Sequence, residues 1–229
     1  DYAIASSCSF YPAHHITTGE GGMVSSNDER IITTARSLSC WGRDCYCVGA
    51  ANLLSCGTCG KRFDKWLEGY DEIVDHKYIF TNMGYNLKPL DLQGAIGLVQ
   101  LKKFEQIYTN RRNSKERLQK IMEATIEDIS IPVESPQADT SWFGTPIICR
   151  DKKQKNHLVQ YLESIKVQTR NYFAGNILLH PGYRHLDDYK KYPNANEVFN
   201  KAFFIGASPH YGEEIFDYIQ SKLEEEYCR

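Results

Sequence analysis

The sequence lacks three features that mark common classes of protein. It has no run of about 18 apolar residues, so no membrane-spanning helix is predicted. It lacks a basic excess, because 27 lysines and arginines face 29 acidic residues. Since nucleic-acid-binding proteins ordinarily carry a basic cluster, neither nucleic acid nor membrane is an expected partner. The opening residues also lack a basic stretch followed by a short apolar core, so we expect no retained secretory signal.

The chain also lacks a methionine before Met23. Residues 2–8 read as a strand with no preceding segment, and a strand of a sheet must be paired or covered. We therefore expect this chain to be the C-terminal part of a longer protein, with proteolytic processing as the alternative.

Cysteine, by contrast, is unusually dense in one stretch. Five of the eight cysteines lie between Cys40 and Cys59. The frameworks of small secreted proteins spread their cysteines more evenly. Cys45 and Cys47 are too close for an easy disulfide, but they suit two ligands of one metal centre. The cluster indicates zinc or iron–sulfur, with unrelated buried cysteines as the alternative.

The residue pattern predicts an α/β chain of two domains. The first, 1–115, contains the strand 2–8, a return strand 23–26, a helix 29–38 and an irregular Cys-rich loop 40–75. Helical spacing returns after Pro89 and predicts one long, bent helix. The second domain, 116–229, is predicted as a small α+β domain. Its expected elements are a linker at 132–139, strands at 142–149 and 167–173, and helices near 158–165 and 215–223.

The segment from Ser9 to Gly22 resembles the cofactor-attachment segment of sugar aminotransferases that use pyridoxal phosphate (PLP). That segment has a serine, an aromatic residue, a lysine five residues after the serine, and a Gly-acidic-Gly-Gly turn. His14 stands in the place of the lysine. One branch of the family has this exchange, the 3-dehydratases of nucleotide-linked 4-keto-6-deoxyhexoses. The best match within it is the type that acts on CDP-linked sugars and binds a 2Fe–2S cluster.

The resemblance runs along the whole chain. It implies the C-terminal portion of a fold-type I PLP-dependent transferase (aspartate aminotransferase-like), with the remainder of the large domain and the small α+β domain. It also implies a cytoplasmic enzyme of 3,6-dideoxysugar synthesis for lipopolysaccharide O-antigen. Further matching segments are Trp41–Cys47, Cys59–Phe63, Asp75–Tyr78, Gly84–Lys88, Ser141–Gly144 and Phe173–Asn176.

The exchange at position 14 changes the expected chemistry. Histidine cannot form a stable imine with the cofactor, and no lysine occurs before Lys61. The expected cofactor is therefore pyridoxamine phosphate (PMP), held without a covalent bond, and an ordinary aminotransferase is excluded. His14 is the predicted base that removes a proton from the cofactor's methylene carbon, so that the C3 hydroxyl of the sugar leaves. The alternative is a loop histidine with satisfied hydrogen bonds.

Other roles follow from the resemblance alone. Ser9 is expected to contact the cofactor phosphate, and Asn86 the phosphate in the neighbouring subunit, which implies a homodimer with shared sites. Asn176 is expected to contact the substrate, a nucleotide sugar. The alternatives are a capping serine and a turn asparagine for Ser9 and Asn86. His15 is either a second supporting residue or polar loop filling.

The resemblance also assigns the cysteines. Forming a dideoxysugar after loss of the hydroxyl needs two electrons, which a 2Fe–2S cluster passes singly from an NADH-dependent iron–sulfur flavoprotein reductase. The implied ligands are Cys45, Cys47 and Cys59, with a fourth upstream of Asp1. Cys56 competes with Cys59, because the stretch from Val48 to Thr58 is longer than the family pattern.

Three rival interpretations stay open. Cys45, Cys47, Cys56 and Cys59 could close a structural zinc site within this chain. A related dehydratase without a cluster shares the histidine exchange. A non-catalytic remnant is the third, because we expect the 229 residues alone to be inactive.

Overall fold

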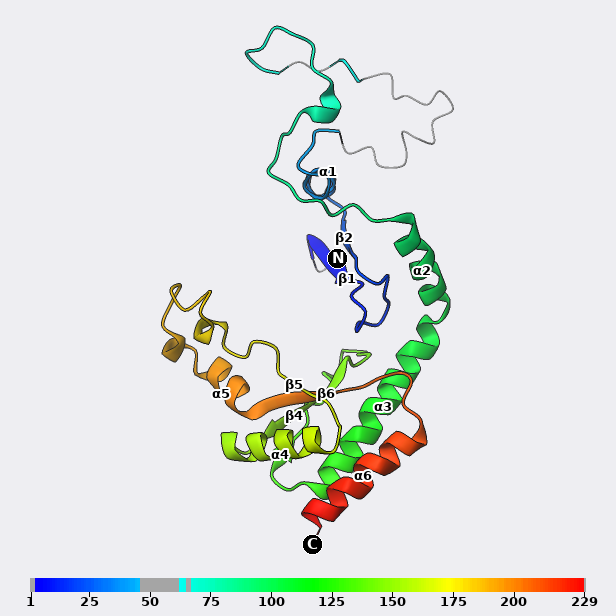
Figure 1. The fold of residues 1–229 in the computed structure, drawn as a ribbon, viewed down its shortest axis with the longest axis vertical. Helices are drawn as coiled ribbons and strands as arrows, with labels where there is room; N and C mark the ends of the chain where they lie inside the picture. The colour runs from blue at the N-terminus through cyan, green and yellow to red at the C-terminus, as the bar shows by residue number, and fades with distance from the viewer. Residues whose placement is uncertain (1–2, 46–61, 65–66, 229) are drawn as a thin grey trace. The chain divides into compact units, whose positions relative to one another are not determined.

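The computed structural model describes residues 3–45, 62–64 and 67–228. The chain forms two compact units, Asp1–Leu101 and Lys102–Arg229 (Figure 1). The domain boundary expected at residues 115 and 116 falls inside a helix of the second unit, α3 (Phe104–Thr125). Each unit is therefore described by itself, with all of α3 in the second.

The first unit begins with an antiparallel hairpin of β1 (Ala5–Ser9) and β2 (Gly22–Ser26). Helix α1 (Glu29–Ser39) follows, and the Asp28 carboxylate caps it by accepting from the Arg30 amide at 2.9 Å. After the cysteine segment come the short 3-10 helix η2 (His76–Tyr78) and α2 (Asp91–Lys102). The hairpin and α1 confirm the expected elements because both rest on local signals, a glycine turn and a helix cap.

The first unit buries little apolar surface. Among its described residues, the buried apolar side chains are Cys40 and Ile79. Helix α2 exposes Leu92 to 69%, Leu98 to 65% and Leu101 to 58%. A helix that is apolar on several faces is of the kind that proteins bury on several sides.

The second unit is an antiparallel sheet with helices packed on it. Its strand order is β3-β4-β6-β5, every neighbouring pair being antiparallel. This arrangement is the α+β architecture expected from the sequence. Its remaining elements are β3 (Ile129–Ser130), β4 (Gly144–Cys149), α4 (Lys152–Ser164), β5 (Thr169–Asn171), η3 (Ile177–Leu179), η4 (Tyr189–Lys191), α5 (Pro193–Lys201), β6 (Ala202–Gly206) and α6 (Glu213–Tyr227).

The helical stretch after Pro89 differs from the sequence expectation, and strand β4 contains a residue that is unusual inside a sheet. The long bent helix is two helices, α2 and α3, separated at Lys103. Strand β4 lies inside the sheet although it contains Pro146, which cannot donate to a neighbouring strand. The reason is the length of β3, which pairs with Ile148 and Cys149 and does not reach Pro146.

The core of the second unit lies between the sheet and three helices. Figure 1 shows α3 beside α6, with α4 along the sheet. Each of these helices and the two central strands contribute side chains that are 0% exposed. They are Leu118 and Met122 of α3, Leu158 and Leu162 of α4, Leu223 of α6, Ile147 of β4 and Phe203 of β6. Among the described residues, no helix is long and apolar enough to cross a membrane.

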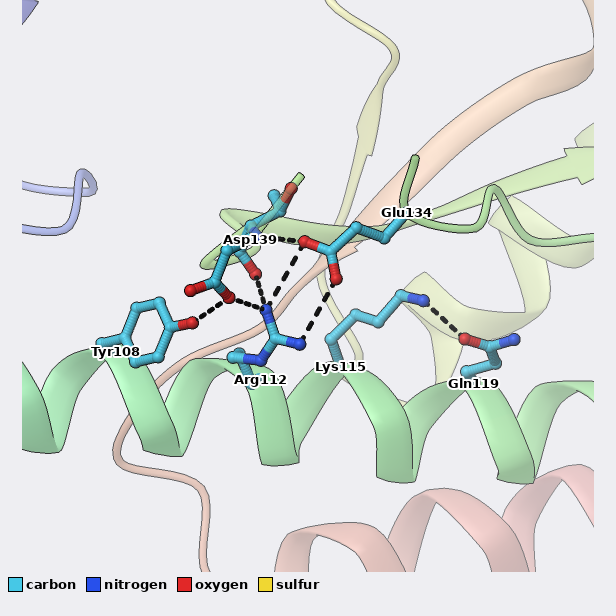
Figure 2. Close-up of polar contacts among 7 residues, drawn as sticks. Tyr108, Arg112, Lys115, Gln119, Glu134 and Asp139 are labelled. Carbon is cyan, nitrogen blue, oxygen red and sulfur yellow. Dashed lines mark hydrogen bonds and ion pairs between the residues drawn. The ribbon is translucent and has the colours of Figure 1, made fainter. Parts of the chain in front are cut away.

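An arginine on α3 fastens the segment that leads into β4. Figure 2 shows the Arg112 guanidinium between Glu134 and Asp139, with nitrogen–oxygen distances of 3.3 and 2.8 Å. It also donates to the Thr140 carbonyl at 2.9 Å, and Tyr108 donates to Asp139. We call these five residues the Arg112 cluster. Their contacts hold residues 134–140 against α3, just before Trp142 in the chain. The Lys115 ammonium lies 4.7 Å from the centre of the Trp142 ring.

The Arg112 cluster predicts how the acid stability of this unit changes on substitution. Hydrogen bonds from Thr140, and then Arg112, hold the pKa of Glu134 below its ordinary 4.5. A depressed pKa stabilises the fold above the unfolded-state pKa, and this stabilisation is lost as the pH falls through the folded-state pKa. Glu134→Gln should therefore flatten the acid limb of the melting temperature between about pH 6 and about pH 3. The control is Glu116→Gln, an exposed substitution on α3 outside the cluster, which should leave the acid limb unchanged. Equal acid limbs for Glu134→Gln and wild type would contradict the stabilising role of the Glu134 carboxylate.

Candidate functional site

The segment from Ser9 to Gly22 is the tip of the β1–β2 hairpin. Ser9 and Gly22 face one another as the last pair of the ladder. The loop closes on itself, because the Phe10 amide donates to the Gly21 carbonyl at 2.9 Å and the Thr18 amide donates to the Phe10 carbonyl at 3.1 Å. Gly21 has φ +148°, and a β-carbon there would overlap the Thr18 hydroxyl. The Gly-acidic-Gly-Gly turn is thus a packed part of the loop.

The loop places His14 beside Ser9. The His14 amide donates to the Tyr11 carbonyl at 2.9 Å. Its Nδ1 lies 3.4 Å from the Ser9 carbonyl oxygen. Because a carbonyl oxygen only accepts, this contact places the proton on Nδ1 and the basic lone pair on Nε2. The Tyr11 ring packs edge-on against the imidazole at 5.7 Å, so ring and backbone together fix its orientation.

The Ser9 hydroxyl is suited to an anionic ligand. It accepts from the Tyr11 amide at 3.3 Å, and its side chain is exposed. Since accepting a hydrogen bond leaves the hydroxyl proton available, Ser9 can donate to a phosphate oxygen. A hydroxyl donor beside an oriented imidazole matches the donor chemistry that a phosphorylated pyridine cofactor needs. The residues present therefore fit PMP.

A helix further along the chain supports this loop. Gln93 of α2 donates to the Glu20 carbonyl at 2.7 Å. Its side-chain oxygen accepts from the Leu90 amide at 2.7 Å, so the residue also caps its own helix. The sequence analysis missed Gln93. The available signal is a glutamine in the first turn of a predicted helix, a typical capping position.

Asn86 and Cys45 both belong to the first unit. Asn86 forms a β-bridge with Cys40, and its side chain is exposed. Cys45 is partly exposed and follows Asp44, whose amide donates to the Ile79 carbonyl at 2.8 Å. The other predicted cluster ligands, Cys47 and Cys59, and the competing Cys56 lie outside the described residues.

The described cysteines form no metal site among themselves. Within residues 3–45, 62–64 and 67–228, no group of three or more metal-binding side chains is close enough to hold an ion. Cys40 is buried, and Cys8 and Cys228 are exposed. Burial raises the pKa of Cys149 to about 11, so its thiol stays protonated near neutral pH.

Asn176 is a buried structural residue of the second unit. It is 3% exposed, and its Oδ1 accepts from the Leu178 amide at 3.1 Å. Its Nδ2 donates to the Tyr189 carbonyl at 3.1 Å and to Asn196 at 2.7 Å. Both donors and the acceptor of the amide are engaged in holding the loop. Contact with a substrate stays a prediction for Asn176.

The chain is similar to several known proteins in sequence and in fold. The chain is 37% identical to a lipopolysaccharide biosynthesis protein, RfbH, from Salmonella typhimurium, covering 95% of the chain and 50% of the relative. It is 38% identical to a dTDP-4-dehydro-2,6-dideoxy-D-glucose 3-dehydratase from Saccharopolyspora spinosa, covering 95% and 47%. Its fold matches an E. coli GDP-4-keto-6-deoxy-D-mannose 3-dehydratase with bound hydrated PLP, at TM-score 0.72 and 24% identity, over 97% and 55% of the two chains.

The chain thus spans about half the length of the curated relatives that it matches. The family model of the DegT/DnrJ/EryC1/StrS aminotransferases matches residues 1–224. The expected family and the α/β fold of a PLP-dependent sugar aminotransferase are therefore confirmed. The chain belongs to the DegT/DnrJ/EryC1/StrS aminotransferase family.

Proposed function

We propose that the protein containing this chain is a PMP-dependent dehydratase that removes the C3 hydroxyl of a CDP-4-keto-6-deoxyhexose. The observation that carries the proposal is His14 in the place of the family's lysine, oriented by the Ser9 carbonyl. The relatives that are named as nucleotide-sugar 3-dehydratases support the reaction class. A histidine without the lysine's amine can move protons but cannot hold the cofactor covalently.

Each residue of the loop has a defined task. Nδ1 of His14 donates to the Ser9 carbonyl, so Nε2 is the atom that accepts a proton from the cofactor's methylene carbon. The Ser9 hydroxyl donates to the cofactor phosphate. The Tyr11 ring restricts rotation of the imidazole. The cofactor, when bound, supplies the electron sink through which the C3 hydroxyl leaves as water after protonation.

The proposal includes a homodimer. Asn86 is exposed, so its amide can reach the phosphate in a neighbouring subunit. The apolar side chains exposed on α2 give a surface that further protein must cover. We place the active site between two copies of the full-length protein, in the cytoplasm, with a nucleotide sugar as substrate.

The proposal also includes electron transfer. Cys45, Cys47 and Cys59 are assigned to a 2Fe–2S cluster that receives electrons from an NADH-dependent iron–sulfur flavoprotein reductase. Thiolate sulfur is the ligand type that such clusters require. The relative named for lipopolysaccharide biosynthesis supports a 3,6-dideoxysugar destined for O-antigen.

The test uses the full-length protein with PMP and the CDP-linked 4-keto-6-deoxy sugar. Wild type should eliminate the C3 hydroxyl, contain iron and sulfide, and absorb visible light. Cys45→Ala should lose the visible absorption and retain the dehydration half-reaction, because the cluster is assigned to the electron transfer that follows loss of the hydroxyl. Cys8→Ala, an exposed cysteine of β1, is the matched control and should retain both.

Two outcomes would overturn parts of this proposal. If metal analysis finds stoichiometric zinc and no iron, the cysteines hold a structural zinc site and the assignment of a 2Fe–2S cluster is refuted. A protein that binds PMP and the sugar but leaves the C3 hydroxyl in place would refute the dehydratase function.

A further inference from the structure

A buried serine joins the cysteine segment to the segment of Asn86. Ser37 lies in the last turns of α1 and is 3% exposed. Its hydroxyl donates to the Arg43 carbonyl at 2.8 Å. The same oxygen accepts from Nδ2 of Asn82 at 3.0 Å. The Ser37 hydroxyl thus links residue 43 to residue 82 through two hydrogen bonds. In the sequence, the entire Cys-rich loop lies between these two residues.

The backbone around this junction is interlocked. The Trp41 amide donates to the Tyr85 carbonyl and the Tyr85 amide to the Leu38 carbonyl, both at 2.7 Å. The amides of Thr81 and Asn82 both donate to the Gly42 carbonyl, at 2.9 and 3.1 Å. These bonds tie the end of α1 to residues 81–85 on both sides of the serine.

Two glycines allow this close approach. Gly42 has φ +77°, and a β-carbon there would overlap the carbonyl of Asn82. A β-carbon at Gly84 would overlap the backbone nitrogen of Gly42. Because the two backbones touch, a small movement of one segment must displace the other.

We propose that Ser37 is a positioning residue that fixes the positions of Cys45 and Asn86 relative to each other. We call the hydrogen-bonded segments 37–43 and 81–85 the frame. The inference deepens the proposed function, on which it rests. Cys45 lies two residues beyond the Arg43 carbonyl, and Asn86 lies four beyond Asn82. The frame therefore sets where the cysteine segment leaves α1 and where the phosphate-binding amide stands. Ser37 itself touches neither group.

The two hydrogen bonds of Ser37 can be separated by substitution. Ser37→Ala removes the donor to Arg43 and the acceptor for Asn82. Asn82→Ala removes the second of these bonds, together with the 3.4 Å bond from Nδ2 to the Thr81 hydroxyl, and leaves the bond from Ser37 to Arg43 in place. In Ser39→Ala, two residues along α1, the lost hydroxyl donates to Arg36 within the helix, so this is the matched control.

The experiment measures hydrogen exchange and PMP affinity on the full-length protein. Ser37→Ala should raise exchange in peptides covering both 40–45 and 81–87, and weaken PMP binding about tenfold, as expected for loss of one or two buried hydrogen bonds. Asn82→Ala should weaken PMP binding similarly and raise exchange more at 81–87 than at 40–45, where the Ser37 bond to the Arg43 carbonyl remains. The double variant should bind PMP about as weakly as Ser37→Ala, because Ser37→Ala already removes the Ser37–Asn82 bond.

The outcomes separate this inference from the proposed function. If wild type binds PMP and Ser37→Ala leaves both peptides protected and the affinity unchanged, the positioning role is refuted. The positioning role is also refuted if Ser39→Ala has equal effects, because loss of any hydroxyl at this end of α1 would then loosen both segments. If wild type binds no PMP, the proposed function falls, and with it the role of the frame in placing Asn86.

Discussion

Replacing His14 by lysine in the full-length protein should abolish dehydration. The lysine amine can attach PLP covalently, and near neutral pH the free side chain is protonated and cannot serve as the base that the imidazole provides. The variant should retain PLP through dialysis, with the absorbance of a bound cofactor, and release no water from the sugar. Assay of C3-hydroxyl loss alongside cofactor absorbance measures both effects in one sample.

His14→Asn isolates the base. Asparagine can still donate from its amide to the Ser9 carbonyl, which His14 Nδ1 approaches at 3.4 Å, but it has no basic nitrogen. Loss of a general base costs roughly 10²- to 10⁴-fold in rate, so kcat should fall by that factor while PMP affinity holds. His185→Asn changes an exposed histidine outside this loop, so it is the control and should retain activity. Full activity in either His14 variant would refute the assignment.

The hairpin and its loop were accessible from the sequence because their determinants are close together in the chain. Ser9, His14 and Gly21 all lie within one connection, so a local pattern specifies their neighbourhood. The helix α1 was accessible for the same reason, since Asp28 caps it from the adjacent position. The family and the fold-type I fold were predicted from the resemblance along the whole chain, whereas these local signals predicted the hairpin and α1.

Long-range placement was not accessible in the same way. Asn176 belongs to a family-like segment, but its burial comes from Tyr189 and Asn196, which are 13 and 20 residues away. Ser37 meets Asn82 across 45 residues, and no periodicity marks either one. Strand β6 is an apolar run of 5 residues, a length at which a buried strand and a buried helix look alike.

Phe203→Ala should be among the most destabilising single changes in the second unit. Phe203 is 0% exposed in β6, where it pairs with Ile147 of β4 and Asn171 of β5. Removing a buried phenylalanine side chain costs about 3–5 kcal/mol, through lost burial and the cavity left behind. That is a large share of the roughly 5–15 kcal/mol that stabilises a domain. Hydrogen exchange of the β4 and β6 amides in the full-length protein measures this loss of stability in the strands that contain Phe203 and its partner Ile147.

The control is another phenylalanine of the same unit. Phe173 is 71% exposed and touches Phe204 with a centroid distance of 5.8 Å. Phe173→Ala loses this ring contact and the one with Tyr172 but leaves no cavity, so it should cost about 1–2 kcal/mol. Because both variants delete the same atoms, the difference between them reports packing alone. Equal protection of β4 and β6 in the two variants would mean that Phe203 does not fill the core between the sheet and its helices.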